Sequence, residues 1–207
     1  MNEKPVYYVC SFGGCGSTML TQYLSHFGKT KHIHSRNPPS QLTYVGEENT
    51  SNPVYREWFN DVPVNQNELH KYKVIYIYRN PLNAIYSRFV TPNKPKFSHL
   101  KNIQCDNNGE IRLLEVINSK KDLYKLEEFF DNYTTTRERN YNIYCVNYDK
   151  FWDNIEEFNK VIGIPNIKLL YPVRKETMRI GHLNKELNEI YRPLIDKMNR
   201  KNFIEIV

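Results

Sequence analysis

Short apolar runs alternate with amphipathic segments along this chain, and the alternation predicts an α/β fold. Val6 to Cys10, Lys73 to Tyr78 and Ile143 to Asn147 are rich in β-branched and aromatic residues, as buried parallel strands are. Residues 31–34 predict a shorter strand. Because strands that alternate with helices form parallel sheets covered on both faces, we expect a three-layer α/β fold with a central, mostly parallel sheet of four to five strands flanked by helices.

Between the predicted strands, apolar positions recur at three- and four-residue spacing, which is typical of helices that bury one face. Asn80 and Pro81 suit the N-cap and first position of a helix. Asp149 is expected to cap a later helix that Gly163 ends. Pro193 predicts a bend in the last helix. The predicted helical segments are 17–28, 81–89, 110–133 (in two pieces), 149–163 and 183–198.

Composition favours one intracellular domain with an anionic ligand. The chain of 207 residues suits one domain with a sizeable core, which we take to be residues 1–207. The net charge of +6 suits an anion, but Lys and Arg are scattered, so nucleic acid is not the expected partner. No apolar stretch approaches the ~20 residues that span a bilayer. The N-terminus leads almost directly into a strand, so we expect no signal peptide, no membrane span and a cytoplasmic location.

The four cysteines show no metal-ligand spacing, so no metal site is expected. Cys10 and Cys145 lie in predicted strands, which predicts buried thiols. Unpaired cysteines of this kind fit a reducing, intracellular setting.

A loop with three glycines joins the first predicted strand to the first predicted helix. Glycines let the backbone approach a ligand, and the N–H groups and dipole of the first helical turn favour an anion. The order of strand, glycine loop and helix therefore predicts a phosphate or sulfate site, although a glycine-rich turn before an amphipathic helix has the same pattern. The loop residues concerned are Gly13, Gly14, Cys15, Gly16, Ser17 and Thr18.

Other phosphate-binding motifs do not fit this loop. A Walker A motif has lysine after its last glycine, whereas Ser17 follows Gly16, which disfavours a P-loop nucleotide kinase or GTPase. Neither Cys10 nor Cys15 is followed by the arginine of a C-x5-R phosphatase loop. The dinucleotide-binding G-x-G-x-x-G sequence is also absent.

A second candidate anion site follows the Lys73 to Tyr78 strand. Arg79 stands at the carboxyl end of this strand, where a guanidinium can make forked, charge-assisted contacts to a phosphate. Ser87 lies two helical turns into the next helix and could donate its hydroxyl to the same group. The alternative is that Arg79 pairs with a nearby carboxylate while Ser87 packs against the sheet.

These segments resemble motifs of the sulfotransferases that use 3′-phosphoadenosine 5′-phosphosulfate (PAPS). VCSFGGCGSTML is similar to their 5′-phosphosulfate loop, and KVIYIYRNPLNAIYSRF to their 3′-phosphate motif, including its arginine-to-serine spacing. YNIYCVNYDKFWDNIEEFNKVIGIP resembles the family's strand, Tyr-acid-x-hydrophobic segment and Gly-Ile-Pro ending. VRKETMRIGHLNKELNEIYRPLIDKM is similar to the C-terminal Arg-Lys stretch and its helix. The four pieces follow the family's order.

The resemblance implies a P-loop-like phosphosulfate-binding loop after the first strand and transfer of a sulfuryl group from PAPS to a hydroxyl or amine, without a metal. The glycine-loop residues would hold the 5′-phosphosulfate, and Arg79 and Ser87 the 3′-phosphate. Tyr148 would lie near the adenine. Arg174 and Lys175 would close over the nucleotide, which leaves as PAP.

One position departs from the family pattern. A lysine or arginine usually contacts the leaving oxygen from the loop, and Gly14 occupies that position here. The missing cation could cost several kcal/mol of transition-state stabilisation, unless Lys31, Arg36 or a C-terminal cation replaces it. The alternatives are an unusual acceptor chemistry or a protein that binds PAP or PAPS without efficient turnover.

His34 is the first candidate for the catalytic base, followed by His32 and Asp61. The two histidines end the second strand with the parity of the catalytic Glu and His in the family's glycan-modifying branch, although exposed histidines at a strand end are the simpler interpretation. The acceptor is expected to be a small molecule or carbohydrate. Its pocket would come from the loops 35–53 and 91–109, whose aromatic residues suit sugars and phenols.

Overall fold

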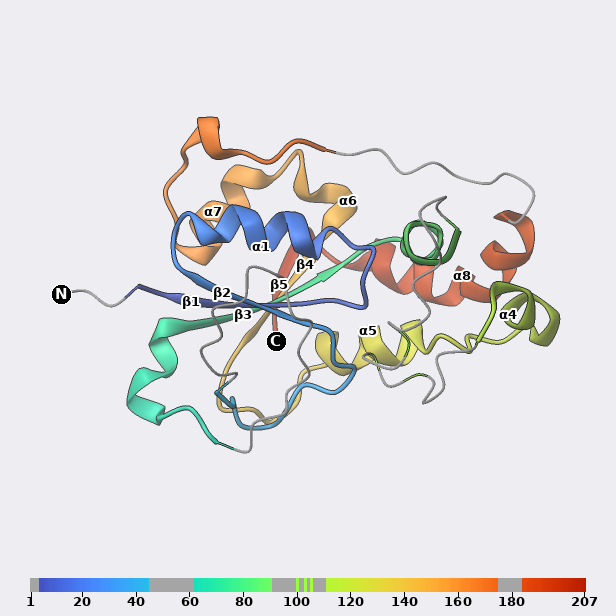
Figure 1. Ribbon diagram of the computed structural model, residues 1–207, viewed down its shortest axis with the longest axis horizontal. Coiled ribbons are helices and arrows are strands. Elements are labelled where there is room, and N and C mark those ends of the chain that lie inside the picture. Colours follow the sequence, from blue (N-terminus) through green and yellow to red (C-terminus); the bar gives the residue numbers. More distant parts are fainter. Residues whose placement is uncertain are drawn as a thin grey trace.

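The fold is built around a five-stranded sheet with the strand order β2-β1-β3-β4-β5 (Figure 1). The computed structural model describes residues 4–44, 62–90, 100, 103, 105, 111–174 and 184–207. The first four strands are parallel, and β5 runs antiparallel to β4. The expected α/β architecture with a mostly parallel sheet is confirmed. The strands are β1 (Val6–Cys10), β2 (Lys29–Ile33), β3 (Tyr72–Tyr78), β4 (Ile143–Asn147) and β5 (Ile204–Ile206).

Helices cover both faces of this sheet (Figure 1). Apolar side chains of α1, α6 and α7 pack on one face, and those of α2, α4, α5 and α8 belong to the core on the other. The α-helices are α1 (Ser17–Ser25), α2 (Pro81–Ile85), α4 (Leu113–Ser119), α5 (Leu126–Thr134), α6 (Tyr148–Phe151), α7 (Ile155–Ile162) and α8 (Asn184–Arg200). Shorter helical turns are η1 (Gln66–Lys71), η2 (Tyr86–Val90) and η3 (Lys168–Leu170).

The carboxyl ends of the parallel strands meet at one edge of the sheet. Cys10 pairs with Ile33 and with Tyr76, and Tyr78 pairs with Asn147. The segments that follow β1, β2, β3 and β4 therefore start side by side. In open α/β sheets, this is the edge at which ligands bind.

Aromatic side chains fill the core between the sheet and α5. The ring of Tyr76 stacks on those of Phe129 and Tyr133, with centroid separations of 5.8 and 4.5 Å. Cys10 and Cys145 are buried on the same face, as predicted. This packing holds α5 against the middle of the sheet.

The helix predicted from Asp149 to Gly163 is in fact two helices. Asn147 caps α6, because its side-chain oxygen accepts the Asp149 N–H at 2.9 Å, and α7 starts afresh at Ile155. The prediction that Asp149 is a helix cap is therefore wrong. Its carboxylate has a partner from another part of the chain, which a local sequence pattern does not reveal.

Two further elements differ from the sequence prediction. The helix after Asn80 begins as expected, with Pro81 at its start, but changes to a π-helical turn over Tyr86–Val90. π-Helical turns inside helices are often found at functional sites. The three-residue strand β5 was not predicted individually, because so short a run carries no periodic signal.

Some sequence predictions concern residues outside the described part of the chain. These are Asp61, Lys175 and the segments 45–60 and 91–99. Within the described residues, no helix is long and apolar enough to cross a membrane.

Candidate functional site

The glycine loop connects β1 to α1 through three residues in the left-handed region. The φ angles are +108° at Gly13, +69° at Gly14 and +82° at Gly16, and residues with a Cβ rarely adopt such backbone angles. Gly16 is the N-cap of α1, and no side chain caps this helix end within the described structure. The first turn contains no acidic residue, so its N–H groups and dipole present a positive end to the loop.

The loop is pressed between two helices. A Cβ placed on Gly14 would lie 2.6 Å from the backbone oxygen of Ala84 and 3.1 Å from the Cβ of Ser87. A Cβ on Gly16 would collide with the ring of Tyr148. The predicted loop, Ser87 and Tyr148 are therefore brought together. The same packing leaves no room for a side chain at Gly14.

Arg79 lies at the end of β3 with only 8% of its side chain exposed. Its Nε donates to Asp149 Oδ1 at 3.3 Å, and the Asn80 backbone N–H donates to Asp149 Oδ2 at 2.9 Å. The guanidinium carbon also lies 4.6 Å from the centroid of the Tyr148 ring. The alternative of pairing with a carboxylate is thus observed, and this pair fixes how the guanidinium is oriented beside the loop.

Arg88 is a candidate that the sequence reasoning missed. It follows Ser87 in the π-helical turn, and its Nε is buried. Its charge acts on the thiol of Cys15 and on the ring of His32, so it lies within electrostatic range of both the glycine loop and the end of β2. The sequence signal for this residue was an arginine directly after Ser87. Only the π-helical turn and the packing of the glycine loop show that Arg88 lies near the candidate site.

Cys15 is buried at the centre of this cluster. Burial raises the pKa of its thiol to about 12, although the guanidinium groups of Arg79 and Arg88 act in the opposite direction. The Sγ–H donates to the Gly13 carbonyl at 3.2 Å. The side chain is therefore a neutral thiol at physiological pH, and the positive charges of Arg79 and Arg88 both act on it.

The two histidines lie at the same edge and are buried. Nδ1 of His34 is 2.6 Å from the carbonyl oxygen of Ser11, which can only accept, so this nitrogen carries the proton. The Ser11 hydroxyl, 3.4 Å from the same nitrogen, donates to the Ser17 hydroxyl at 2.9 Å. His34 is thereby connected to the start of α1. The expectation of simple exposed histidines is not met.

His32 differs from His34 in its surroundings. Burial, together with the nearby charge of Arg88, lowers its pKa to about 4, so the ring is neutral at physiological pH. The rings of His32 and His34 are 4.5 Å apart and tilted by 51°. Both candidates for the base therefore occupy one compact group next to the loop.

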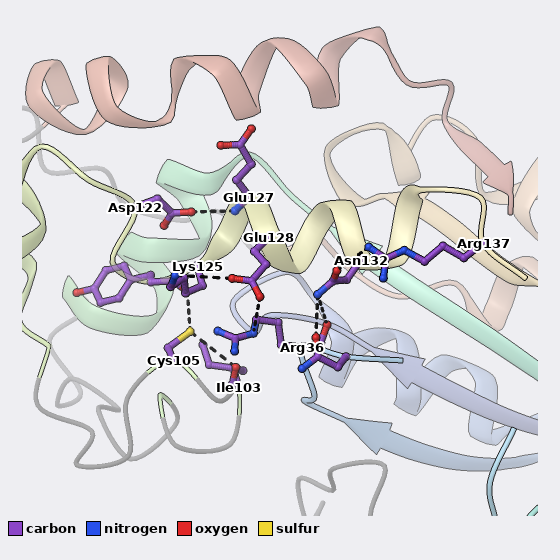
Figure 2. A network of polar contacts seen from close by, with 11 residues as sticks. Arg36, Ile103, Cys105, Asp122, Lys125, Glu127, Glu128, Asn132 and Arg137 are labelled. Atoms are coloured by element: carbon purple, nitrogen blue, oxygen red, sulfur yellow. Dashed lines mark hydrogen bonds and ion pairs between the residues drawn. The ribbon is translucent and has the colours of Figure 1, made fainter. Parts of the chain in front are cut away.

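Arg36, a proposed replacement for the loop cation, points elsewhere. Figure 2 shows its guanidinium directed toward α5, where Nε lies 3.3 Å from Glu128 Oε1. The Asn132 amide donates to the Arg36 carbonyl at 3.2 Å and to Asn37 Oδ1 at 2.9 Å, and Arg137 donates back to Asn132 at 3.0 Å. This network fastens the segment after β2 to α5, so Arg36 has a structural position away from the loop.

The remaining residues predicted from the sequence lie in different environments. Thr18 is exposed in the first turn of α1. Arg174 is exposed and its charge acts on the Tyr148 hydroxyl, where it opposes the effect of burial, which raises the pKa of this tyrosine. Lys31 is the middle residue of the edge strand β2, where it pairs with Tyr8 and lies two residues before the end of the strand. Among the residues that the structure describes, no three His, Cys, Asp or Glu side chains form a group that could hold a metal ion.

Comparison with known proteins adds no family assignment. No protein-family model, curated protein or solved structure matches this chain. The functional argument therefore depends on the residues and their geometry.

Proposed function

We propose that this protein is a sulfotransferase that moves the sulfuryl group of PAPS to a hydroxyl or amine of a carbohydrate or small-molecule acceptor. One observation carries the proposal. The glycine loop at the start of α1 packs directly against the helix that bears Ser87, and Arg79 lies beside both. Two elements that the sequence suggests as anion sites, separated by sixty residues of sequence, are thus neighbours, and this supports a ligand with phosphates at both its 5′ and 3′ positions.

In this proposal, the loop backbone and the first turn of α1 hold the 5′-phosphosulfate, with the hydroxyls of Ser17 and Thr18. Arg79, oriented by Asp149, and Ser87 bind the 3′-phosphate. Tyr148, which already packs against Arg79, contacts the adenosine. Arg174 and Lys175 close the site from the C-terminal segment.

Arg88 takes the place of the missing loop cation. A lysine at Gly14 does not fit, because Ala84 and Ser87 occupy the space of its Cβ. Arg88 brings a positive charge to the same loop from the π-helical turn. Sulfuryl transfer, like phosphoryl transfer, depends on positive charge and donors around the oxygens that gain negative charge.

His34 is the proposed base. With the proton on Nδ1 and directed to the Ser11 carbonyl, its Nε2 is the basic nitrogen of the ring. His32, which is neutral because of its low pKa, is the second candidate. Removing a proton from the acceptor while the loop holds the sulfuryl group would need no metal.

The test is calorimetric titration with PAP, AMP and ATP plus magnesium. Wild type is expected to bind PAP much more tightly than AMP, because only PAP has a 3′-phosphate. Arg79→Ala is expected to weaken PAP binding by about 10- to 100-fold, the loss expected for hydrogen bonds to a charged group. Arg192→Ala, at an exposed arginine of α8, is the matched control. Equal affinity for PAP and AMP would remove the sulfotransferase interpretation.

Gly14 also favours a second candidate, a protein that binds PAP or PAPS without turnover. The two differ in what Arg88 does. A catalytic protein releases PAP in the presence of a suitable acceptor, and Arg88→Met suppresses this release. A pure binding protein binds PAPS with the same residues but forms no PAP with any class of acceptor.

A further inference from the structure

A cavity of about 310 Å³ lies over the amino halves of β1, β2 and β3. Its strand residues come from the first three positions of β1 and β2 and from the first position of β3, and Lys4, Tyr44 and η1 complete the lining. None of the described α-helices contributes to it. The volume is at the small end of the range for ligand pockets, so the cavity suits a compact ligand.

This cavity is separate from the proposed nucleotide site. Val6, which lines the cavity, pairs with Lys29 and Tyr72, whereas the glycine loop follows Cys10 at the other end of β1. At the usual rise of a strand, Val6 and Cys10 are ~13 Å apart. Figure 1 shows the start of β1 and the turquoise η1 at the end of the sheet away from the loop that leads into α1. No residue of the proposed nucleotide site, and neither candidate base, lines the cavity.

The strand residues of the lining share one face of the sheet. Tyr8 pairs with Lys31, and the side chains of paired residues point to the same side. Tyr72 and Tyr76 also point to this side, because they are four residues apart in one strand. Phe129 of α5 stacks on Tyr76 at the carboxyl half of this face. The cavity thus occupies the amino half, which α5 does not line.

Three tyrosines give the cavity an aromatic surface. Tyr8 is only 1% exposed, and its ring meets that of Tyr72 edge to face at a centroid separation of 5.6 Å. The Tyr8 hydroxyl donates to the Thr43 carbonyl at 3.3 Å, and the Tyr44 N–H donates to the Val62 carbonyl at 2.8 Å. These bonds fix the backbone around Tyr44, whose side chain is at the rim. Aromatic surfaces of this kind favour a ligand with a ring.

Four lysines and one glutamate also line the cavity. The lysines are Lys4, Lys29, Lys31 and Lys71. Glu68 is paired with Lys71, whose Nζ lies 2.9 Å from its Oε1. Burial raises the pKa of Tyr72, and the charges of Lys71 and Lys29 oppose this rise, so both ammonium groups lie within electrostatic range of its hydroxyl. The lining has an excess of positive charge and favours an anion.

We propose that this cavity binds a compact organic anion with a flat ring, with the ring against Tyr44 and Tyr72 and the anionic group beside Lys29 and Lys31. Lysines on an edge strand such as β2 also prevent sheets from pairing edge to edge. That role alone requires neither the tyrosines nor a cavity. The proposal does not rest on the sulfotransferase function, because the two sites share no residue.

The test is an NMR titration of ¹⁵N-labelled protein with 2-naphthoate at neutral pH and constant ionic strength. Backbone amides of Tyr8, Lys31 and Tyr72 are expected to shift along a saturable curve, while those of Gly14 and Gly16 stay unchanged. Acetate, which has the charge without the ring, should bind about tenfold more weakly or worse. 2-Naphthamide, which has the ring without the charge, should lose about fivefold or more.

Variants of the lining test the two kinds of contact. The double variant Lys29→Gln, Lys31→Gln is expected to weaken 2-naphthoate binding by about fivefold, because it removes two partly exposed ion pairs. Tyr44→Ser should weaken it by about threefold or more through loss of the ring contact. Glu68→Gln should strengthen binding, because it removes the carboxylate that competes for Lys71, and a misfolded variant would not give this gain. Lys160→Gln, at an exposed lysine of α7, is the control and keeps the wild-type affinity.

Four results would overturn the proposal. These are shifts that do not saturate, an affinity for acetate or 2-naphthamide equal to that for 2-naphthoate, an unchanged affinity in the double lysine variant, or shifts confined to the glycine loop. Absence of saturable binding would leave the lysines with protection of the β2 edge as their role.

Discussion

Replacing Gly14 with alanine tests whether the glycine loop is pressed against α2. Two penalties add at this position. The φ of +69° is left-handed, which costs a residue with a Cβ about 1–2 kcal/mol. The new Cβ would also lie 2.6 Å from the Ala84 backbone oxygen, and forcing an atom into such packed structure typically costs about 1–3 kcal/mol. The expected loss of stability is roughly 2–5 kcal/mol.

Gly163→Ala is a matched control for the backbone penalty alone. Its φ of +79° is nearly the same, but a Cβ there would meet nothing within 4 Å. Only the left-handed cost of about 1–2 kcal/mol remains. For a chain of this size, each kcal/mol lowers Tm by about 2–4 °C. We expect Gly14→Ala to lower Tm by roughly 4–20 °C and Gly163→Ala by roughly 2–8 °C.

Urea unfolding of both variants measures the difference, and titration with PAP shows whether the loop still binds. The contact with Ala84 predicts an excess loss of about 1–3 kcal/mol for Gly14→Ala. Equal losses in the two variants would refute the reasoning, because the loop would then not touch α2. Gly14→Lys would be at least as destabilising and is not expected to raise turnover, although it restores the residue usual in the resembled family.

Two further predictions concern Arg88 and His32. Arg88→Met is expected to lower turnover with PAPS by about 100- to 1000-fold, the usual cost of losing one donor to the transition state. The affinity for PAP should change little. Unchanged turnover would show that Arg88 does not have the proposed role. The same variant should raise the pKa of His32, measured by NMR, because the charge of Arg88 helps to lower it. Because the folded pKa of His32 is about 4 against an ordinary 6.5, the unfolded state binds the proton more readily. Stability is therefore full above about pH 6.5 and falls by up to about 3 kcal/mol as pH decreases to 4. His32→Asn, which retains His34 and Arg88 beside the site, should reduce this slope in urea titrations at several pH values, and an unaltered slope would contradict the buried neutral ring.

Local sequence alone was enough to locate much of the sheet and the outline of the loop. The strands at Val6, Lys73 and Ile143 were predicted within one residue of their observed limits, because dense runs of β-branched and aromatic residues have few other conformations. The glycines of the loop do adopt left-handed backbone angles. Arg79 was correctly expected at a strand end, because a helix starting at Pro81 leaves no other place for it.

Only the tertiary structure decided what these residues touch. Asp149 fits a helix cap in sequence, yet it binds Arg79 and the Asn80 backbone, because β3 and β4 are neighbours in the sheet. The pairing of β1 with β3 brings Gly14 against Ala84, which excludes a loop lysine and gives Arg88 its place. Such contacts join residues far apart in the chain. The physical reason is that strand order and packing, rather than local propensity, select them.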